Sequence, residues 1–108
     1  NVLNVPLAPH TDGKAYRSAF EAQVMPAVAA ARPQLIMVSA GFDAHARDPL
    51  ANMRLVEKDF AWITDRICDL ADEHAQGRVV SVLEGGYDLD ALASSTAAHV
   101  TVLMERGE

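Results

Sequence analysis

Asp43 and Tyr87 are the two side chains of this sequence that are best placed to do chemistry. Each follows a short apolar segment, in Ser39-Ala40-Gly41-Phe42-Asp43-Ala44-His45 and in Leu83-Glu84-Gly85-Gly86-Tyr87. Both segments are typical of buried parallel strands, and the carboxyl edge of a parallel sheet is where open α/β folds keep their chemistry. We therefore expect the carboxylate and the phenol to emerge at the same edge of one sheet.

Asp43 has two interpretations. An aspartate after a strand commonly caps a turn, but a carboxylate held at a sheet edge is also a suitable hard ligand for a divalent metal. Gly41 allows a tight bend, and the loop that follows is longer than a βα connection requires, which favours the second interpretation. A catalytic zinc site needs three protein ligands, so Asp43 and the nearby His45 are too few. His74 and His99 fall on predicted helices, as packing or solvated residues. The metal site is therefore incomplete on this chain.

Tyr87 also has two interpretations. Gly85 and Gly86 could form a simple turn, with Tyr87 packed over the end of the sheet. Alternatively, the two glycines let the main chain pass close to a ligand and turn the phenol inward. A phenol is a good neutral hydrogen-bond donor for an oxyanion that forms on a carbonyl group.

Composition limits the classes of function. The chain has 108 residues, 50% of them hydrophobic and 22% charged, which fits one globular unit. The formal net charge of −6 disfavours a nucleic acid partner. Cys68 is the only cysteine, which excludes a disulfide framework and a thiolate zinc cluster. No apolar run reaches about 18 residues and no signal-peptide pattern is present, so we expect a cytoplasmic setting without a membrane.

The predicted elements alternate between strands and helices. Strands are expected over residues 2–6, 35–38 and 79–83, the second covered on both faces. A helix interrupted at Pro26 and ended by Pro33 precedes the second strand, and a helix over 56–74 follows it. Asp88 is expected to cap a last helix whose apolar stripe is Leu89, Leu92, Ala93, Thr96, Val100 and Leu103. This order predicts a three-layer α/β unit over residues 1–108, with a parallel sheet and flanking helices.

The motifs together resemble the C-terminal part of the histone deacetylase superfamily. They are Val38-Ser39-Ala40-Gly41-Phe42-Asp43-Ala44-His45, then Asp48-Pro49-Leu50, then Leu83-Glu84-Gly85-Gly86-Tyr87. The resemblance is greatest to the bacterial branch, which includes acetoin-utilisation proteins and acetylpolyamine amidohydrolases. It spans nearly the whole chain and implies an arginase-like α/β fold and a zinc-dependent amidohydrolase that removes acetyl groups from amines.

The resemblance also implies roles for single residues. Asp43 matches the third zinc ligand of the family, and Tyr87 matches the tyrosine that hydrogen-bonds the scissile carbonyl and its oxyanion. Leu50 matches a residue that lines the acyl-lysine tunnel, and Gly85 and Gly86 match the glycines beside the tunnel. His45 is not a ligand in that pattern.

The sequence also departs from the family pattern. The family's other two zinc ligands, an Asp-x-His pair, and its adjacent histidines come earlier in the family sequence and are not present here. We therefore expect this chain to be a piece of a longer protein, inactive alone and prone to form homo-oligomers through an unpaired strand edge. Val56 stands where a hydroxyl residue would commonly cap the next helix.

Two other classes of function remain open. One is a non-catalytic α/β binding module or a pseudo-enzyme. The other is a ureohydrolase on a related arginase-like fold, although Tyr87 after paired glycines argues against it. Within the deacetylase class, the substrate could be acetyl-lysine, an acetylpolyamine or another small amide.

Overall fold

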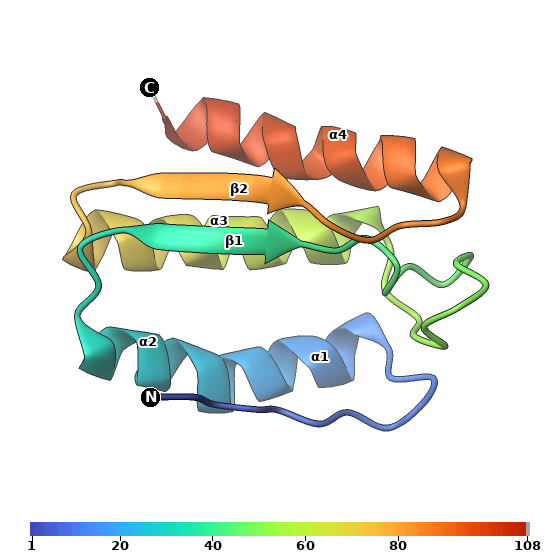
Figure 1. Ribbon diagram of the computed structural model, residues 1–108, viewed down its shortest axis with the longest axis horizontal. Helices are drawn as coiled ribbons and strands as arrows, with labels where there is room; N and C mark the ends of the chain where they lie inside the picture. Colours follow the sequence, from blue (N-terminus) through green and yellow to red (C-terminus); the bar gives the residue numbers. More distant parts are fainter. Residues whose placement is uncertain (108) are drawn as a thin grey trace.

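A pair of parallel strands lies at the centre of the molecule. The computed structural model describes residues 1–107; Glu108, the last residue of the predicted unit, lies outside the described residues. Strand β1 (Ile36–Ala40) pairs with β2 (Val79–Leu83) along their whole length, with Ile36 opposite Val79 and Ala40 opposite Leu83. Helix α3 (Glu57–His74) lies behind the strands in Figure 1, with α4 (Leu89–Arg106) above it. The predicted α/β class, with parallel strands and flanking helices, is confirmed.

Residues 2–6 do not form the predicted first strand. They run as an extended segment beside the first helix (Figure 1), and the Val2 side chain is 86% exposed. Val5 and Leu7 instead line a small hollow with Tyr16 and Phe20 of that helix. A strand needs a hydrogen-bonded neighbour, and within residues 1–107 the helix segment occupies the space between this segment and the sheet.

The first helical segment is continuous but changes its pitch. It consists of α1 (Gly13–Ala19), the π-helical turn η1 (Phe20–Val24) and α2 (Met25–Ala31). Pro26 is the second residue of α2, so the predicted restart at this proline is confirmed. Proline has no N–H and its ring crowds the carbonyl four residues earlier, which explains the wider turn before it. Helix α2 ends where Arg32 adopts a left-handed conformation, directly before Pro33.

Helix α3 begins without the usual cap side chain. Val56 is its N-cap residue and offers no hydroxyl, as the sequence indicates. The Asp59 carboxylate accepts a hydrogen bond from the Val56 N–H (2.9 Å), which is the reciprocal half of a capping box. The helix then follows the predicted range closely and stops before Gly77, which has a φ of +75°.

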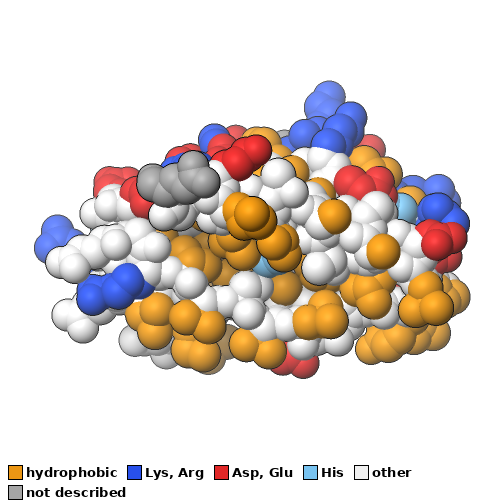
Figure 2. Space-filling view, turned by 90° about the horizontal axis from the view of Figure 1, so that it is seen from above, with side chains coloured by type: hydrophobic (Ala, Val, Ile, Leu, Met, Phe, Trp, Pro, Cys, Tyr) orange, Lys and Arg blue, Asp and Glu red, His pale blue; other side chains and the backbone are white. Residues whose placement is uncertain are grey.

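The hydrophobic core lies between the strands and α3. Buried Ala40, Phe42, Leu55 and Phe60 form its centre, and the Phe42 and Phe60 rings meet edge to face at 5.2 Å. On the opposite face of the sheet, Met37 is 70% exposed. Within residues 1–107, β1 is therefore not covered on both faces, which contradicts the expectation from its sequence. The crossover helix α3 covers only one face. Figure 2 shows hydrophobic side chains gathered along the lower margin of the molecule when it is seen from above.

Helix α4 turns inward a face that overlaps only partly with the predicted one, since Leu92 of the predicted stripe packs against the core. Asp88 caps it as expected, because its carboxylate accepts a hydrogen bond from the Ala91 N–H (2.9 Å). The buried residues of the helix, however, are Ala91, Ser95 and His99, whereas Leu89 is 79% exposed. Two of these three residues, Ala91 and Ser95, have small side chains. No helix within residues 1–107 combines the length and the apolar character needed to cross a membrane.

His99 joins three elements through its two ring nitrogens. Its Nδ1 lies 2.7 Å from the Thr64 hydroxyl of α3, and its Nε2 lies 2.8 Å from the Ser81 hydroxyl of β2. The Thr64 hydroxyl donates its proton to the Phe60 carbonyl, so it must accept from Nδ1, and Nε2 then accepts from Ser81. His99 is therefore a packing residue, one of the two roles expected of it, and burial lowers its pKa, which favours the neutral ring.

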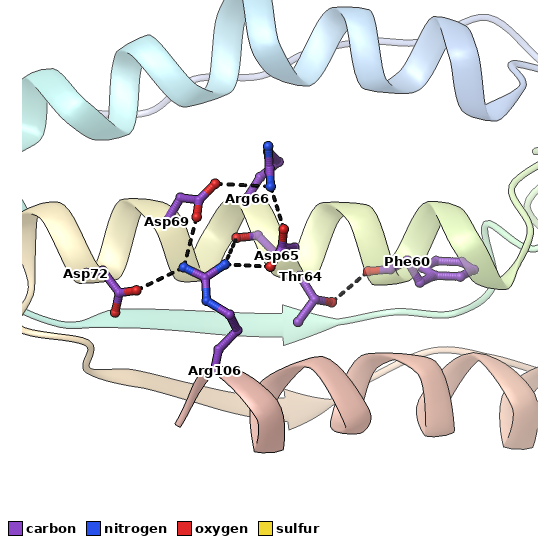
Figure 3. Close-up of polar contacts among 7 residues, drawn as sticks. All are labelled: Phe60, Thr64, Asp65, Arg66, Asp69, Asp72 and Arg106. Carbon is purple, nitrogen blue, oxygen red and sulfur yellow. Dashed lines mark hydrogen bonds and ion pairs between the residues drawn. The ribbon is translucent and has the colours of Figure 1, made fainter. Parts of the chain in front are cut away.

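Arg106 ties the end of α4 to the side of α3. Its guanidinium contacts three carboxylates spaced along one face of α3, those of Asp65, Asp69 (2.8 Å) and Asp72 (2.9 Å) (Figure 3). The hydrogen bond from Arg106 holds the pKa of the Asp65 carboxyl below its usual range. The two longest helices are thus fixed to each other near the C-terminal end of α4.

Substitution Arg106→Ala is expected to lower the free energy of unfolding by about 1 to 2 kcal/mol, because three partly exposed contacts to Asp carboxylates are lost together. Urea denaturation followed by circular dichroism measures this change. Lys14→Ala, which removes one exposed positive charge from α1, is the matched control and should change stability by less than about 0.5 kcal/mol. Equal effects of the two substitutions would contradict a structural role for the Arg106 cluster.

The buried neutral His99 predicts a loss of stability in mild acid. Because burial lowers its pKa in the folded state, the unfolded chain binds a proton more readily as the pH falls below about 6.5. Stability should therefore decrease from pH 7.5 to pH 5.5, and His99→Gln should flatten this dependence while exposed His10→Gln should not. Urea denaturation at both pH values tests this, and the same slope in wild type and His99→Gln would contradict it.

Candidate active site

The two strands continue to pair beyond their ends. The Glu84 N–H donates to the Ala40 carbonyl (2.9 Å), and the Phe42 N–H donates to the Gly85 carbonyl (2.8 Å). The chain segments that leave β1 and β2 therefore remain side by side at the carboxyl edge of the sheet, at the right of Figure 1. This is the edge to which the sequence assigned its candidate site residues.

The Asp43 carboxylate is enclosed by two glycines, one from each segment. A Cβ atom placed on Gly85 would lie 2.9 to 3.0 Å from the carboxylate atoms, and one placed on Gly41 would lie 2.8 Å from Oδ1. Both distances are shorter than real Cβ contacts, so only glycine fits these positions without displacing the carboxylate. Asp43, which is half-buried, is thus brought directly against Gly85 in the segment that leads to Tyr87.

Tyr87 and Leu50 are exposed and are joined by one carboxylate. Their side chains are 56% and 64% exposed, respectively. The Tyr87 N–H donates to Asp48 Oδ2 (2.8 Å), and the Leu50 N–H donates to Asp48 Oδ1 (2.8 Å). The structure therefore links the backbones of two predicted site residues that lie far apart in the sequence.

Sequence reasoning missed this role of Asp48. An aspartate that accepts from the N–H two residues later is a common turn pattern, so the Leu50 contact has a local signal. The contact with Tyr87 spans 39 residues and has no such signal. Only the three-dimensional arrangement of the two loops identifies it.

Gly86 has a different requirement from Gly85. Its φ is +138°, a backbone conformation that residues with a side chain rarely adopt. A Cβ atom on Gly86 would also lie 2.7 Å from Leu92 Cδ1. The chain can therefore turn from β2 towards Tyr87 only because position 86 is a glycine.

The long loop after β1 is held in place by main-chain hydrogen bonds. Ala46 and Leu55 are joined by a bond from the Ala46 N–H to the Leu55 carbonyl (2.8 Å), and the Leu55 N–H donates to the Ala44 carbonyl (3.0 Å). A second loop supports it, because the His10 N–H donates to the Asn52 carbonyl (2.6 Å). The loop that carries Asp43, Asp48 and Leu50 is therefore a defined structure.

His45 is buried and its ring is fully used by the protein. Its Nδ1 accepts a hydrogen bond from the Arg47 N–H (3.1 Å), so Nε2 carries the proton and donates to the Glu57 carboxylate of α3. The ring also stacks on Phe60, with 10° between the ring planes. The bond to His45 lowers the pKa of Glu57. Because both nitrogens are engaged, His45 serves as a structural anchor of the loop and offers no free nitrogen to a metal.

The remaining candidate side chains do not add to the site. Cys68 is buried on α3, and burial raises the pKa of its thiol, which disfavours the reactive thiolate. Within residues 1–107, no three His, Cys, Asp or Glu side chains gather in an arrangement that could hold a metal ion. Asp43 is nevertheless a suitable ligand for a hard or borderline cation, since its carboxylate lies at an open sheet edge against glycine backbone.

Comparison with known proteins identifies the family. The sequence profile of the histone deacetylase domain matches residues 1–103. The chain is 51% identical over 85 residues to the histone deacetylase-like amidohydrolase of Pseudomonas aeruginosa, covering 79% of this chain and 22% of that protein. It is 39% identical over 105 residues to the type-2 histone deacetylase 1 of Dictyostelium discoideum, covering 97% of this chain and 7% of that protein.

A solved structure shows the same arrangement. The crystal structure of the HDA15 HD domain superposes with a TM-score of 0.83 at 32% identity, covering 91% of this chain and 27% of that chain. This chain therefore spans 27% or less of the length of each of these three relatives. From the matched profile and the shared fold, we conclude that the chain belongs to the histone deacetylase family.

Proposed function

We propose that the full-length protein is a zinc-dependent amidohydrolase that removes acetyl groups from acetylated amines, and that this chain supplies the C-terminal part of its active site. The observation that carries the proposal is the position of the Asp43 carboxylate against Gly85, in the segment that leads to Tyr87. Family membership adds the reaction class. Because the chain spans only part of its relatives, the remaining site residues would come from other parts of the protein.

Asp43 would act as one ligand of the zinc ion. Its carboxylate supplies a negative charge at the sheet edge, where it occupies the space that the missing side chains of Gly41 and Gly85 leave. A zinc ion supplies Lewis-acid polarisation of the amide carbonyl when it is bound. Since no further group of ligands occurs within residues 1–107, we propose that this chain is inactive alone.

Tyr87 would donate a hydrogen bond to the carbonyl oxygen of the substrate. Its side chain is exposed, and its phenol is a neutral donor that can follow the negative charge as it develops on that oxygen. Such a donor stabilises the transition state more than the bound substrate, so it contributes mainly to turnover. Tyr87 is therefore the catalytic residue that we assign to this chain.

Leu50, Gly85 and Gly86 would line the path of the acyl group. Leu50 presents an exposed apolar side chain, Gly85 presents bare backbone beside Asp43, and Gly86 follows it against Leu92 and Phe42. Such a surface suits an uncharged acetamide more than an anion. Acetyl-lysine and acetylpolyamines both carry this group, and the net charge of −6 is compatible with the cationic remainder of either substrate.

Substitution Tyr87→Phe in the full-length protein is expected to lower turnover of an acetyl-lysine fluorogenic peptide by about 100- to 1000-fold, because one oxyanion donor is lost. Zinc content should remain unchanged, as the phenol is not proposed as a ligand. Tyr16→Phe makes the same chemical change at the other tyrosine of this sequence and should retain turnover. Retention of full turnover by Tyr87→Phe would contradict the assignment.

Substitution Asp43→Ala should instead remove the metal. We expect zinc affinity to fall by more than about 100-fold, since the loss of an outer partner of a ligand alone costs about 10- to 100-fold. Elemental analysis of the dialysed full-length protein measures bound zinc. Asp90→Ala, a change at an exposed position of α4, is the control and should keep its zinc. Normal zinc content in Asp43→Ala would show that Asp43 is not a ligand.

A further inference from the structure

We propose that Asp48 is a positioning residue, whose carboxylate holds the main chain of Tyr87 so that the phenol is fixed over the site. The inference rests on the proposed function, to which it adds a residue that touches neither metal nor substrate. Its basis is a single carboxylate with two engaged oxygens: Oδ2 accepts from the Tyr87 N–H and Oδ1 accepts from the Leu50 N–H, both at 2.8 Å. One side chain therefore joins the two segments that carry Leu50 and Tyr87, the exposed residues at the rim of the candidate site.

The segment before Tyr87 needs such an external support. Two consecutive glycines precede it, and glycine loses more conformational freedom on folding than any other residue. The pairing with β1 ends at the Gly85 carbonyl, and α4 begins only after Asp88. Between these points, the hydrogen bond from the Tyr87 N–H to Asp48 fixes the backbone of the segment. A bond from an N–H to a carboxylate is also stronger than one to a neutral acceptor.

Asp48 itself is well anchored. Its own N–H donates to the carbonyl of His45 (3.0 Å), and the His45 side chain is only 4% exposed beneath the loop. His45 is bonded in turn to Glu57 at the start of α3. A short chain of hydrogen bonds through Asp48, His45 and Glu57 thereby connects the Tyr87 backbone to α3.

The neighbouring charges support the same geometry. The Arg47 guanidinium lies 3.9 Å from the Asp88 carboxylate and 3.7 Å from the Asp90 carboxylate, at the start of α4. Arg47 is 60% exposed, so these ion pairs are weak. They nevertheless show that Arg47, the neighbour of Asp48, lies beside the segment that follows Tyr87. The loop after β1 and the loop after β2 therefore meet at two adjacent points.

Amide hydrogen exchange of the full-length protein tests the contact without reference to activity. Asp48→Ala should accelerate exchange at the Tyr87 N–H by about 10- to 100-fold, the effect of losing a hydrogen bond to a charged group. Asp12→Ala, which removes a similar bond from a backbone N–H (2.9 Å) at the start of α1, should leave exchange at Tyr87 unchanged. Unchanged exchange in Asp48→Ala would overturn the proposal.

Turnover then separates a positioning role from a general structural one. Asp48→Ala should lower kcat by about 10- to 100-fold, because a small misplacement of a reacting group costs that much. In the Tyr87→Phe background the same change should lower kcat by only about twofold or less, because its effect is exerted through the phenol that is already absent. A twofold change is no larger than the usual deviation from additivity of two independent substitutions. An equal loss in both backgrounds would show that Asp48 does not act through Tyr87, and would overturn the proposal.

Two further outcomes have defined meanings. If Tyr87→Phe keeps full turnover, the proposed function of Tyr87 fails, while the exchange experiment still decides whether Asp48 holds its backbone. If Asp48→Ala does not fold, Asp48→Asn replaces it, since an amide keeps the size of the side chain but has only one acceptor oxygen. Exchange at the N–H of Tyr87 or of Leu50 should then increase in Asp48→Asn, and protection of both would overturn the proposal.

Discussion

The register between β1 and β2 is the constraint on which the candidate site depends. Ala40 lies opposite Leu83, and main-chain bonds carry this pairing two residues further on each side. Asp43 follows Ala40 by three residues and Gly85 follows Leu83 by two, so the two positions meet only in this register. A shift by one residue would turn every side chain of a strand to the other face and would separate the carboxylate from the glycine. The strand register, and not a side-chain contact, therefore brings Asp43 and Gly85 together.

The packing beneath the sheet fixes α4 to its neighbours through directional polar contacts. His99 bonds Thr64 of α3 with one nitrogen and Ser81 of β2 with the other, so α4 is fixed to both neighbours at its middle. Arg106 fixes the C-terminal end of α4 to α3. An apolar interface would tolerate sliding more readily, whereas these directional bonds are satisfied in one arrangement only. The rim loops thus rise from elements whose relative positions are specified.

Features that depend on local chemistry were predictable from the sequence, and features that depend on distant partners were not. The bounds of β2, the cap at Asp88 and the helix restart at Pro26 follow from apolar runs, a side-chain acceptor and a missing N–H. The segment over 2–6 has the composition of a strand but is separated from the sheet by the first helical segment. The inward face of α4 was predicted only in part: Leu92 packs on the core, but the buried line includes His99, whose partners Thr64 and Ser81 lie far away in the sequence. At the site, the motifs identify Asp43 and Tyr87 as candidates, but the bond from the Tyr87 N–H to Asp48 joins loops that only the fold brings together.

The two glycines before Tyr87 meet separate physical demands, and the difference indicates how the site is built. Gly85 leaves space, because any Cβ there would lie within 3.0 Å of the Asp43 carboxylate. Gly86 provides conformation, because its φ of +138° suits only a residue without a side chain and because Leu92 packs against it. The first glycine therefore lets the carboxylate of one loop lie against the backbone of the other, and the second redirects that backbone so that Tyr87 follows within two residues. A ligand held by the carboxylate would consequently lie beside a segment whose path is set by glycine geometry on one side and by Asp48 on the other. A backbone fixed in this way is what a hydrogen-bond donor requires if it is to stay in a constant position.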